Sequence, residues 1–166
     1  NITVLFSDIR GFTSYSENHK PEEVVVNLNK VLEAQAEVVE KFGGDIDKFV
    51  GDELMAVFQD DFNAVSCAVE MIKAVQAVDK EINQGLKVGI GINTGEVLAG
   101  NIGSENRMEY AVIGDTVNLA SRLCSFAGPN TVLVSENTYQ KVSSQISATL
   151  VPNKQVKGKK EPVNIY

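Results

Sequence analysis

The strongest constraint on the fold lies in residues 46–58, where Gly51 and Asp52 separate two short apolar runs. Short apolar runs on either side of a glycine and an acid predict a β-hairpin with the acid at its tip. Upstream, residues 2–6 are apolar or β-branched and predict a buried strand that runs into Asp8. Each segment therefore delivers one carboxylate from the end of a strand, where a site can open.

Asp8 and Asp52 form a candidate metal site. Each has a glycine close by in the sequence, and two aspartates on neighbouring strands can hold two divalent ions close to a phosphate chain. Mg²⁺ takes oxygen ligands and is usually held by one or two carboxylates together with substrate phosphates. Because Asp and Gly are also common turn residues, either aspartate alone is typical of an ordinary turn. The pair, together with the downstream residues described below, favours the metal site.

The rest of the chain predicts alternating helices and strands. Pro21 suits a first helical position and Gly43-Gly44 suits a helix end, so the apolar stripe between them predicts a long helix. The other expected elements are helices at 65–82, 116–126 and after Ser135, strands at 86–92, 131–134 and around 157–160, a continuation of the sheet at 95–102, and a hairpin arm at 101–110. This order favours an α/β or α+β sandwich with helices on one face of a mixed sheet.

Length and composition exclude several classes of protein. At 166 residues, with 43% apolar and 22% charged residues, the chain predicts one globular domain with a sizeable core. A formal net charge of −7 argues against nucleic-acid binding, which needs a basic face. No apolar run approaches the roughly 18 residues of a membrane span, so we expect no membrane contact by this domain.

The cysteines and the histidine exclude further chemistries. Cys67 and Cys124 stand apart in helix-like apolar patterns, so buried free thiols and a reducing compartment, the cytoplasm, are expected. The only histidine, His19, precedes a helix start, so neither a histidine metal site nor a catalytic triad is expected. Because Asn1 lies in the run-up to a strand, we expect a fragment of a longer protein, whose other parts could hold a sensor or a membrane anchor.

Asn118 and Arg122 are a second candidate for chemistry. They are four residues apart, so they lie on the same face of the helix expected at 116–126, while Leu119 and Leu123 can serve the core. An amide beside a guanidinium suits a sugar and a phosphate, although the same pair is also typical of a solvated helix face. Lys157 adds a cation beside a glycine, in a basic tail of a kind that is commonly only solvated.

Four blocks of sequence, at 6–13, 45–53, 110–122 and 156–159, stand in the order found in one family. Together they resemble the class III nucleotidyl cyclases, the adenylyl and guanylyl cyclase catalytic domains, and most of all the bacterial adenylyl cyclases. The resemblance implies one catalytic domain over residues 1–166, with an α+β fold whose ferredoxin-like mixed sheet has helices packed on it. It also implies a head-to-tail homodimer whose active sites are built from both chains, with the arm at 101–110 reaching the partner.

The resemblance also implies the role of each site residue. It implies that Asp8, Asp52 and the carbonyl of Ile9 bind two Mg²⁺ ions, which Mn²⁺ can replace, and that the backbone of Gly11, Phe12 and Thr13 binds the phosphates. It implies that Lys48 reads the purine and that Asn118 orients the ribose. It also implies that Arg122 stabilises the reacting α-phosphate and that Lys157 binds the terminal phosphates.

Ala111 departs from the family pattern. Adenylyl cyclases usually carry Asp or Thr there as a second purine reader, and alanine cannot accept a hydrogen bond from the 6-amino group of adenine. The ammonium of Lys48 can donate to a ring nitrogen of adenine, whereas it cannot accept from the N1–H and 2-amino group of guanine. ATP is therefore the expected substrate, with weaker discrimination against GTP than two readers would give.

Three other interpretations are less well supported. The stretch 50–54 is also similar to the signature turn of diguanylate cyclases, but the Asn118/Arg122 helix and Lys157 have no place in that family's pattern. Residues 89–95 lack the spacing and the βαβ context of a dinucleotide-binding loop. A catalytically dead cyclase-like domain kept for dimerisation would have no use for the metal-binding and transition-state residues, all of which are present.

Overall fold

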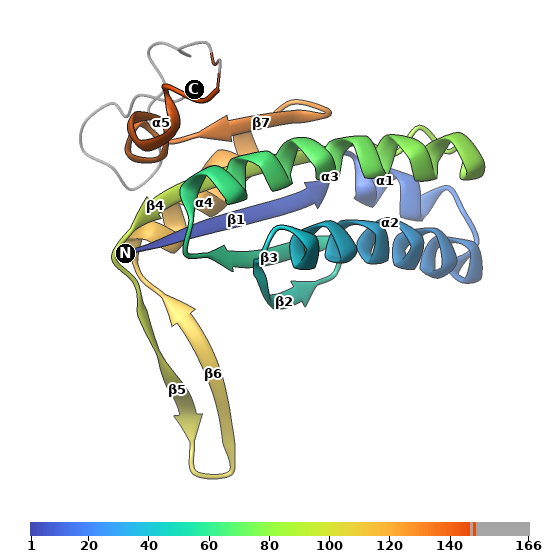
Figure 1. Cartoon of the computed structure of the whole chain (residues 1–166). Coiled ribbons are helices and arrows are strands. Elements are labelled where there is room, and N and C mark those ends of the chain that lie inside the picture. Colours follow the sequence, from blue (N-terminus) through green and yellow to red (C-terminus); the bar gives the residue numbers. More distant parts are fainter. Residues whose placement is uncertain (147, 149–166) are drawn as a thin grey trace.

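A five-stranded sheet forms the centre of the computed structural model, which describes residues 1–146 and 148. Its strands are β1 (Ile2–Ile9), β2 (Asp45–Val50), β3 (Glu53–Phe58), β4 (Val88–Gly95) and β7 (Thr131–Val134). They lie in the order β2–β3–β1–β4–β7, with β4 and β7 parallel and the other neighbours antiparallel (Figure 1). The predicted mixed sheet of an α+β fold is confirmed.

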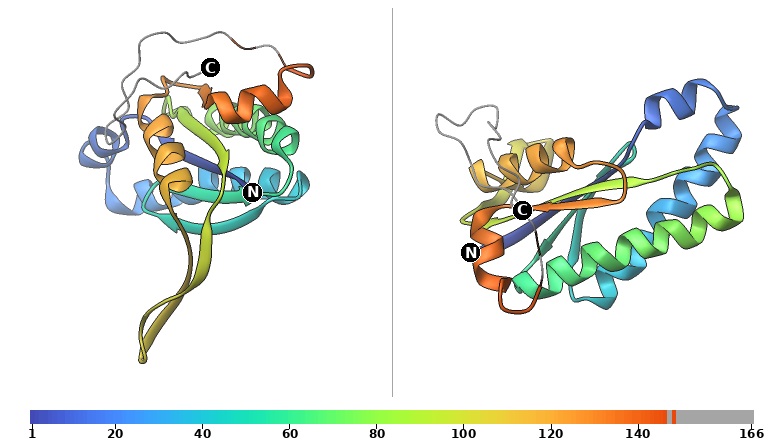
Figure 2. Two further views of the ribbon diagram at one scale, coloured as in Figure 1. Left: turned by 90° about the vertical axis from the view of Figure 1, so that its left-hand side faces the viewer. Right: turned by 90° about the horizontal axis from the view of Figure 1, so that it is seen from above.

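Helices cover both faces of this sheet. They are α1 (Phe12–Glu17), α2 (Pro21–Lys41), α3 (Asp61–Ile82), α4 (Asp115–Phe126) and α5 (Glu136–Val142). The two views in Figure 2 show helices on both sides of the sheet. Successive side chains of a strand point to opposite faces, so Leu5 of β1 packs with α2 and α3, whereas Val4 and Phe6 pack with α4. The prediction of helices on one face is therefore wrong, because β1 is apolar and buried on both of its faces.

The helix ends follow the capping signals of the sequence. Pro21 lies in the first turn of α2 together with two glutamates, which suit the positive end of the helix dipole. Asp60 caps α3 by accepting a hydrogen bond of 2.9 Å from the backbone N–H of Asn63. Ser135 caps α5 in the same way, accepting from the backbone N–H of Thr138 at 3.3 Å.

A two-stranded arm extends away from the central sheet. It consists of β5 (Leu98–Ser104) and β6 (Arg107–Ile113), which pair only with each other in the part of the chain that the structure describes (Figure 1). The arm is longer than predicted, and the expectation that residues 95–102 continue the sheet is wrong. The pairing of β1 with β4 ends at Ile2 and Gly95, so the chain beyond Gly95 has no neighbouring strand to extend.

Three other predictions have different outcomes. The short helix α1 was not predicted, while both cysteines are buried free thiols as expected. The strands expected around 157–160 lie outside the described residues. Among the helices that the structure describes, none has the length and apolar character needed to cross a membrane.

Candidate functional site

Asp8 and Asp52 lie side by side at one end of the sheet. The backbone N–H of Ile9 donates a hydrogen bond of 3.1 Å to Oδ2 of Asp52, which joins the end of β1 to the β2–β3 turn. The neighbouring register pair is Ser7 of β1 with Leu54 of β3, so the turn projects just past the end of β1. Two carboxylates that are distant in the sequence thus share one sheet edge.

Gly11 lies between β1 and α1, next to this edge, and has a backbone conformation that few other residues adopt. Its φ is +70°, and a left-handed conformation of this kind costs an L-residue with a side chain roughly 1–2 kcal/mol. The carbonyl of Gly11 accepts a hydrogen bond of 3.0 Å from the N–H of Tyr15 and so starts α1. The N–H groups of Phe12 and Thr13 stand in the first turn, where a helix offers no internal acceptor.

Lys48 and Glu53 surround Asp52 with charges of opposite sign. Lys48 is exposed on β2, and Glu53 begins β3. Partial burial raises the pKa of the Glu53 carboxyl above its ordinary value, the charge of Asp52 raises it further, and Lys48 opposes the shift. The part of this shift that comes from Asp52 reflects repulsion between two neighbouring carboxylates, which a cation at this edge would relieve.

Asn118 and Arg122 lie on the outer face of α4. Both are exposed, whereas Leu119 and Leu123 are buried beneath them, as the helical spacing predicts. The predicted pairing of an amide and a guanidinium on one solvent-facing side of this helix is therefore confirmed as a geometry. Their chemical roles stay predictions.

The buried side chain of Asn93 holds the start of α4. Its Nδ2 donates to the carbonyl of Thr116 at 3.1 Å, and its Oδ1 accepts a hydrogen bond of 2.6 Å from the hydroxyl of Ser135. Asn93 is not among the site residues predicted from the sequence. The available signal was that Asn93, a polar residue, directly continues the apolar run 86–92, because a buried polar group needs a hydrogen-bond partner.

Within a single chain, Asn118 lies far from Asp8 and Asp52. Asp8 pairs with Gly89 of β4, whereas Asn93, which holds the first turn of α4, pairs with Val4. Four residues along a strand, at about 3.4 Å each, separate the two places by roughly 14 Å. Asn118 in that first turn is therefore out of reach of Asp8 and Asp52 of its own chain.

Two predicted site residues remain, Ala111 and Lys157. Ala111 lies on β6 opposite Gly100, near the base of the arm. Lys157 lies outside the described residues. Within residues 1–146 and 148, no group of three or more His, Cys, Asp or Glu side chains gathers in a way that could hold a metal ion.

Arg10 is a residue of this edge that the sequence analysis missed. Its guanidinium forms an ion pair with Oδ1 of Asp8. Arg10 directly follows the last residue of β1 and lies two residues after Asp8, so extended backbone continued by one residue would place both side chains on the same face, and this spacing was the available signal. The sequence could not indicate that the same guanidinium also reaches the far end of α4.

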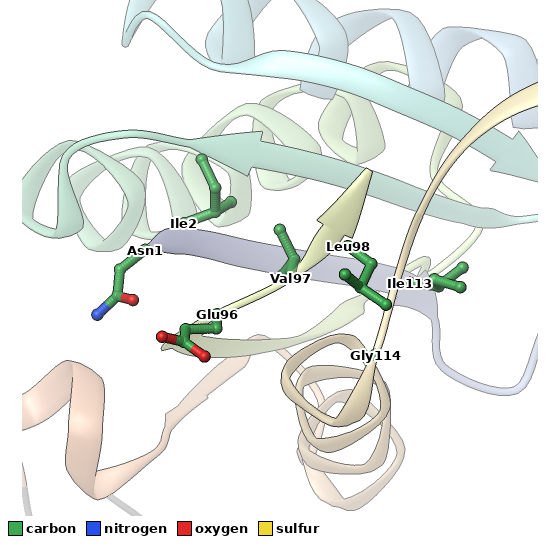
Figure 3. Close-up of a pocket in the computed structure, with 7 residues that line it drawn as sticks. All are labelled: Asn1, Ile2, Glu96, Val97, Leu98, Ile113 and Gly114. Atoms are coloured by element: carbon green, nitrogen blue, oxygen red, sulfur yellow. The ribbon is translucent and has the colours of Figure 1, made fainter. Parts of the chain in front are cut away.

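A hollow of about 440 Å³ lies at the opposite end of β1, at the base of the arm (Figure 3). It is lined by Asn1, Ile2, Glu96, Val97, Leu98, Ile113 and Gly114. It contains none of the predicted site residues, and its one charged side chain is a carboxylate that would repel an anionic substrate. We therefore place the candidate site at the Asp8–Asp52 edge.

The family model for the adenylate and guanylate cyclase catalytic domain matches residues 1–166. A curated relative, the terminal-differentiation-specific adenylate cyclase of Dictyostelium discoideum, is 38% identical over 180 residues, which cover 100% of this chain and 8% of the relative. The chain therefore spans only a small part of that relative's length.

Two solved structures are closely similar to the chain. The adenylyl cyclase CyaB from P. aeruginosa has a TM-score of 0.95 and 40% sequence identity, with 99% of this chain and 91% of that chain covered. The guanylyl cyclase Cya2 has a TM-score of 0.91 and 42% identity, with 99% and 89% covered. Overall similarity therefore does not discriminate between an adenine and a guanine substrate.

Proposed function

The chain belongs to the adenylate and guanylate cyclase catalytic domain family, and from this premise we propose that it converts ATP to 3′,5′-cyclic AMP and pyrophosphate. The observation that carries the proposal is the meeting of Asp8 and Asp52 at one sheet edge, joined by the hydrogen bond from the N–H of Ile9 to Asp52. Two adjacent carboxylates at the end of a strand suit a nucleoside triphosphate with divalent ions.

The residues of this edge fit two Mg²⁺ or Mn²⁺ ions. Oδ1 of Asp8 is buried and, apart from its ion pair with Arg10, has no hydrogen-bond partner within the described chain. We infer that Asp8, Asp52 and the carbonyl of Ile9 hold the ions. Bound there, the ions would make the ribose 3′-hydroxyl easier to deprotonate and would neutralise charge on the leaving pyrophosphate.

The remaining roles follow from charge and backbone geometry. The N–H groups of Phe12 and Thr13, after the turn at Gly11, offer donors to the phosphates beside the metal edge. The planar guanidinium of Arg122 suits the α-phosphate as charge develops on it, and the amide of Asn118 suits the ribose. Lys157, outside the described residues, would bind the terminal phosphates.

The preference for ATP rests on Lys48. Its ammonium is a donor only, so it can pair with a ring nitrogen of adenine and has nothing to offer to the donors of guanine. Ala111 offers no second polar contact, so we expect discrimination to be modest. Because CyaB and Cya2 are about equally similar to this chain, these two positions carry the substrate proposal.

The separation of roughly 14 Å between Asp8 and the first turn of α4 supports a site shared by two chains. In a twofold-symmetric homodimer, the metal edge of one protomer would face α4 of its partner, twice. The arm also suits an interface, because it exposes the large apolar side chains of Leu98, Ile102 and Met108.

Product analysis tests the reaction and the substrate. The purified chain is incubated with Mg²⁺ or Mn²⁺ and equal concentrations of ATP and GTP, and the products are separated. We expect cyclic AMP to exceed cyclic GMP, and Ala111→Thr to sharpen that preference by about 1–3 kcal/mol. Faster formation of cyclic GMP would show that Lys48 is not the purine reader.

Asp8→Asn and Asp52→Asn test the metal edge. Each replaces a carboxylate by an amide of nearly the same shape, so we expect folded proteins without turnover. Glu70→Gln on the exposed face of α3 serves as the matched control, because it also removes one acidic charge, outside both the Asp8–Asp52 edge and the arm. Near-normal cyclisation by both aspartate variants at saturating Mg²⁺ would contradict the assignment.

Mixing two inactive variants tests the shared site. In a dimer of an Asp8→Asn chain with an Asn118→Ala chain, both lesions fall in one site, and the other site is built from intact halves. Random exchange makes half of the dimers mixed, so the mixture should recover roughly a quarter of wild-type activity. Absence of recovery under conditions that permit exchange would refute the shared site.

A further inference from the structure

Arg10 connects two places that belong to different elements. Its guanidinium pairs with Oδ1 of Asp8 at the end of β1. Its Nη1 also donates hydrogen bonds to the backbone carbonyls of Ser125, at 3.3 Å, and Ala127, at 3.0 Å, at the end of α4. A single planar group thus contacts a predicted metal ligand and the helix that carries Asn118 and Arg122.

The Arg10 guanidinium is largely buried and packs over Gly89 of the sheet. Only 20% of the Arg10 side chain is exposed. A Cβ atom at Gly89 of β4 would lie 3.0 Å from Nε and Cζ of Arg10 and 3.0 Å from the carbonyl oxygen of Ala127. A glycine at this position therefore leaves the space through which Arg10 reaches α4.

The contact suits the end of a helix. The last carbonyls of α4 have no acceptor role within the helix, and the C-terminal end carries partial negative charge, so a guanidinium there is favourable. Arg122 is three residues before Ser125, within one helical turn. Loss of the Arg10 contacts would therefore loosen the turn next to Arg122.

We propose that Arg10 is a positioning residue that couples the two composite sites of the homodimer. This proposal rests on the proposed function, in which Asp8 of a protomer serves one site and α4 of the same protomer serves the other. Arg10 competes with divalent ions for Asp8 and braces the end of α4. A metal ion at one site therefore weakens the contact between Arg10 and Asp8. The end of α4 is then held less firmly, so the positions of Asn118 and Arg122 in the other site shift.

Metal binding without turnover gives the first test. Mn²⁺ is titrated into the nucleotide-free protein, and free Mn²⁺ is followed by electron paramagnetic resonance. Arg10→Ala should bind Mn²⁺ about two- to fivefold more tightly than the wild type, since a competing cation is gone. Lys73→Ala, which removes a cation from the exposed face of α3, should not change the affinity. Unchanged or weaker binding by Arg10→Ala would overturn the competition.

The mixed dimer gives the second test, because it separates the two contacts of Arg10. The intact site of that dimer takes its metal edge from the Asn118→Ala chain and its α4 from the Asp8→Asn chain. Arg10→Ala placed in the Asn118→Ala chain should lower the Mn²⁺ concentration for half-maximal activity. Placed in the Asp8→Asn chain, it should lower kcat, by up to about a hundredfold, without changing the metal dependence.

The outcomes distinguish the two proposals. If the mixture without an Arg10 change recovers no activity, the shared site is refuted and coupling through Arg10 with it. If that mixture recovers activity but Arg10→Ala has the same effect in either chain, only the coupling is refuted. Circular dichroism checks folding, and Arg10→Lys, which keeps the charge beside Asp8 without the planar fork, should retain Mn²⁺ affinity and still lower kcat.

Discussion

Replacing Gly91 by alanine should push α4 off the sheet. A Cβ atom at Gly91 would lie no more than 2.7 Å from three backbone atoms of α4, the N of Cys124, the O of Ala120 and the carbonyl carbon of Leu123. Backbone atoms cannot rotate away as side chains do. The helix axis or strand β4 must therefore move to admit one methyl group.

The magnitude follows from the cost of overpacking a tight core. Inserting a methylene where neighbours cannot relax costs about 1–3 kcal/mol. For a protein of this length, each kcal/mol shifts the melting temperature by about 2–4 °C, so we expect a decrease of about 2–12 °C. Gly100→Ala on the arm is the matched control, because the added Cβ meets no atom within 4 Å and should leave stability nearly unchanged.

Thermal unfolding followed by far-ultraviolet circular dichroism measures the melting temperatures of both variants. Because Asn118 and Arg122 lie on α4, the folded Gly91→Ala protein should also lose turnover, whereas Gly100→Ala keeps the central sheet and α4 as they are. Equal unfolding midpoints for the two variants would show that α4 does not pack directly on the backbone of β4.

Three further predictions concern groups in or near the sheet. The pKa of Glu53 is raised above its ordinary value of 4.5, so the native state binds its proton more tightly and loses stability as pH rises through that window. In metal-free protein, Glu53→Gln should therefore raise the melting temperature at pH 7 but not at pH 4, and equal shifts at both would contradict the cause. Burial raises the pKa of Cys67 and of Cys124 to about 12, so a disulfide reagent at pH 8 should label neither thiol until urea is added, and rapid native labelling would be the opposite result. Asn93→Ala leaves the carbonyl of Thr116 without its donor and should cost about 1–3 kcal/mol in urea unfolding, together with a lower kcat; full activity would show that this bond does not position α4.

Patterns over a few neighbouring residues predicted those parts of the site that depend only on turn preference and helical period. The turn at Gly51 and Asp52 follows from two short apolar runs around residues that favour turns. The outward placement of Asn118 and Arg122 follows from the helical period, which sends Leu119 and Leu123 to the core.

The sequence by itself determined which apolar runs form strands, which helix faces are apolar and that Asp8 and Asp52 lie close to strand ends, because these depend on neighbours within a few residues. Only the tertiary structure decided that Asp52 meets the N–H of Ile9, that the chain leaves the sheet after Gly95, and that Arg10 reaches Ala127. These outcomes depend on strand register and on close backbone packing between segments far apart in the chain. No local preference of the residues involved encodes such pairings.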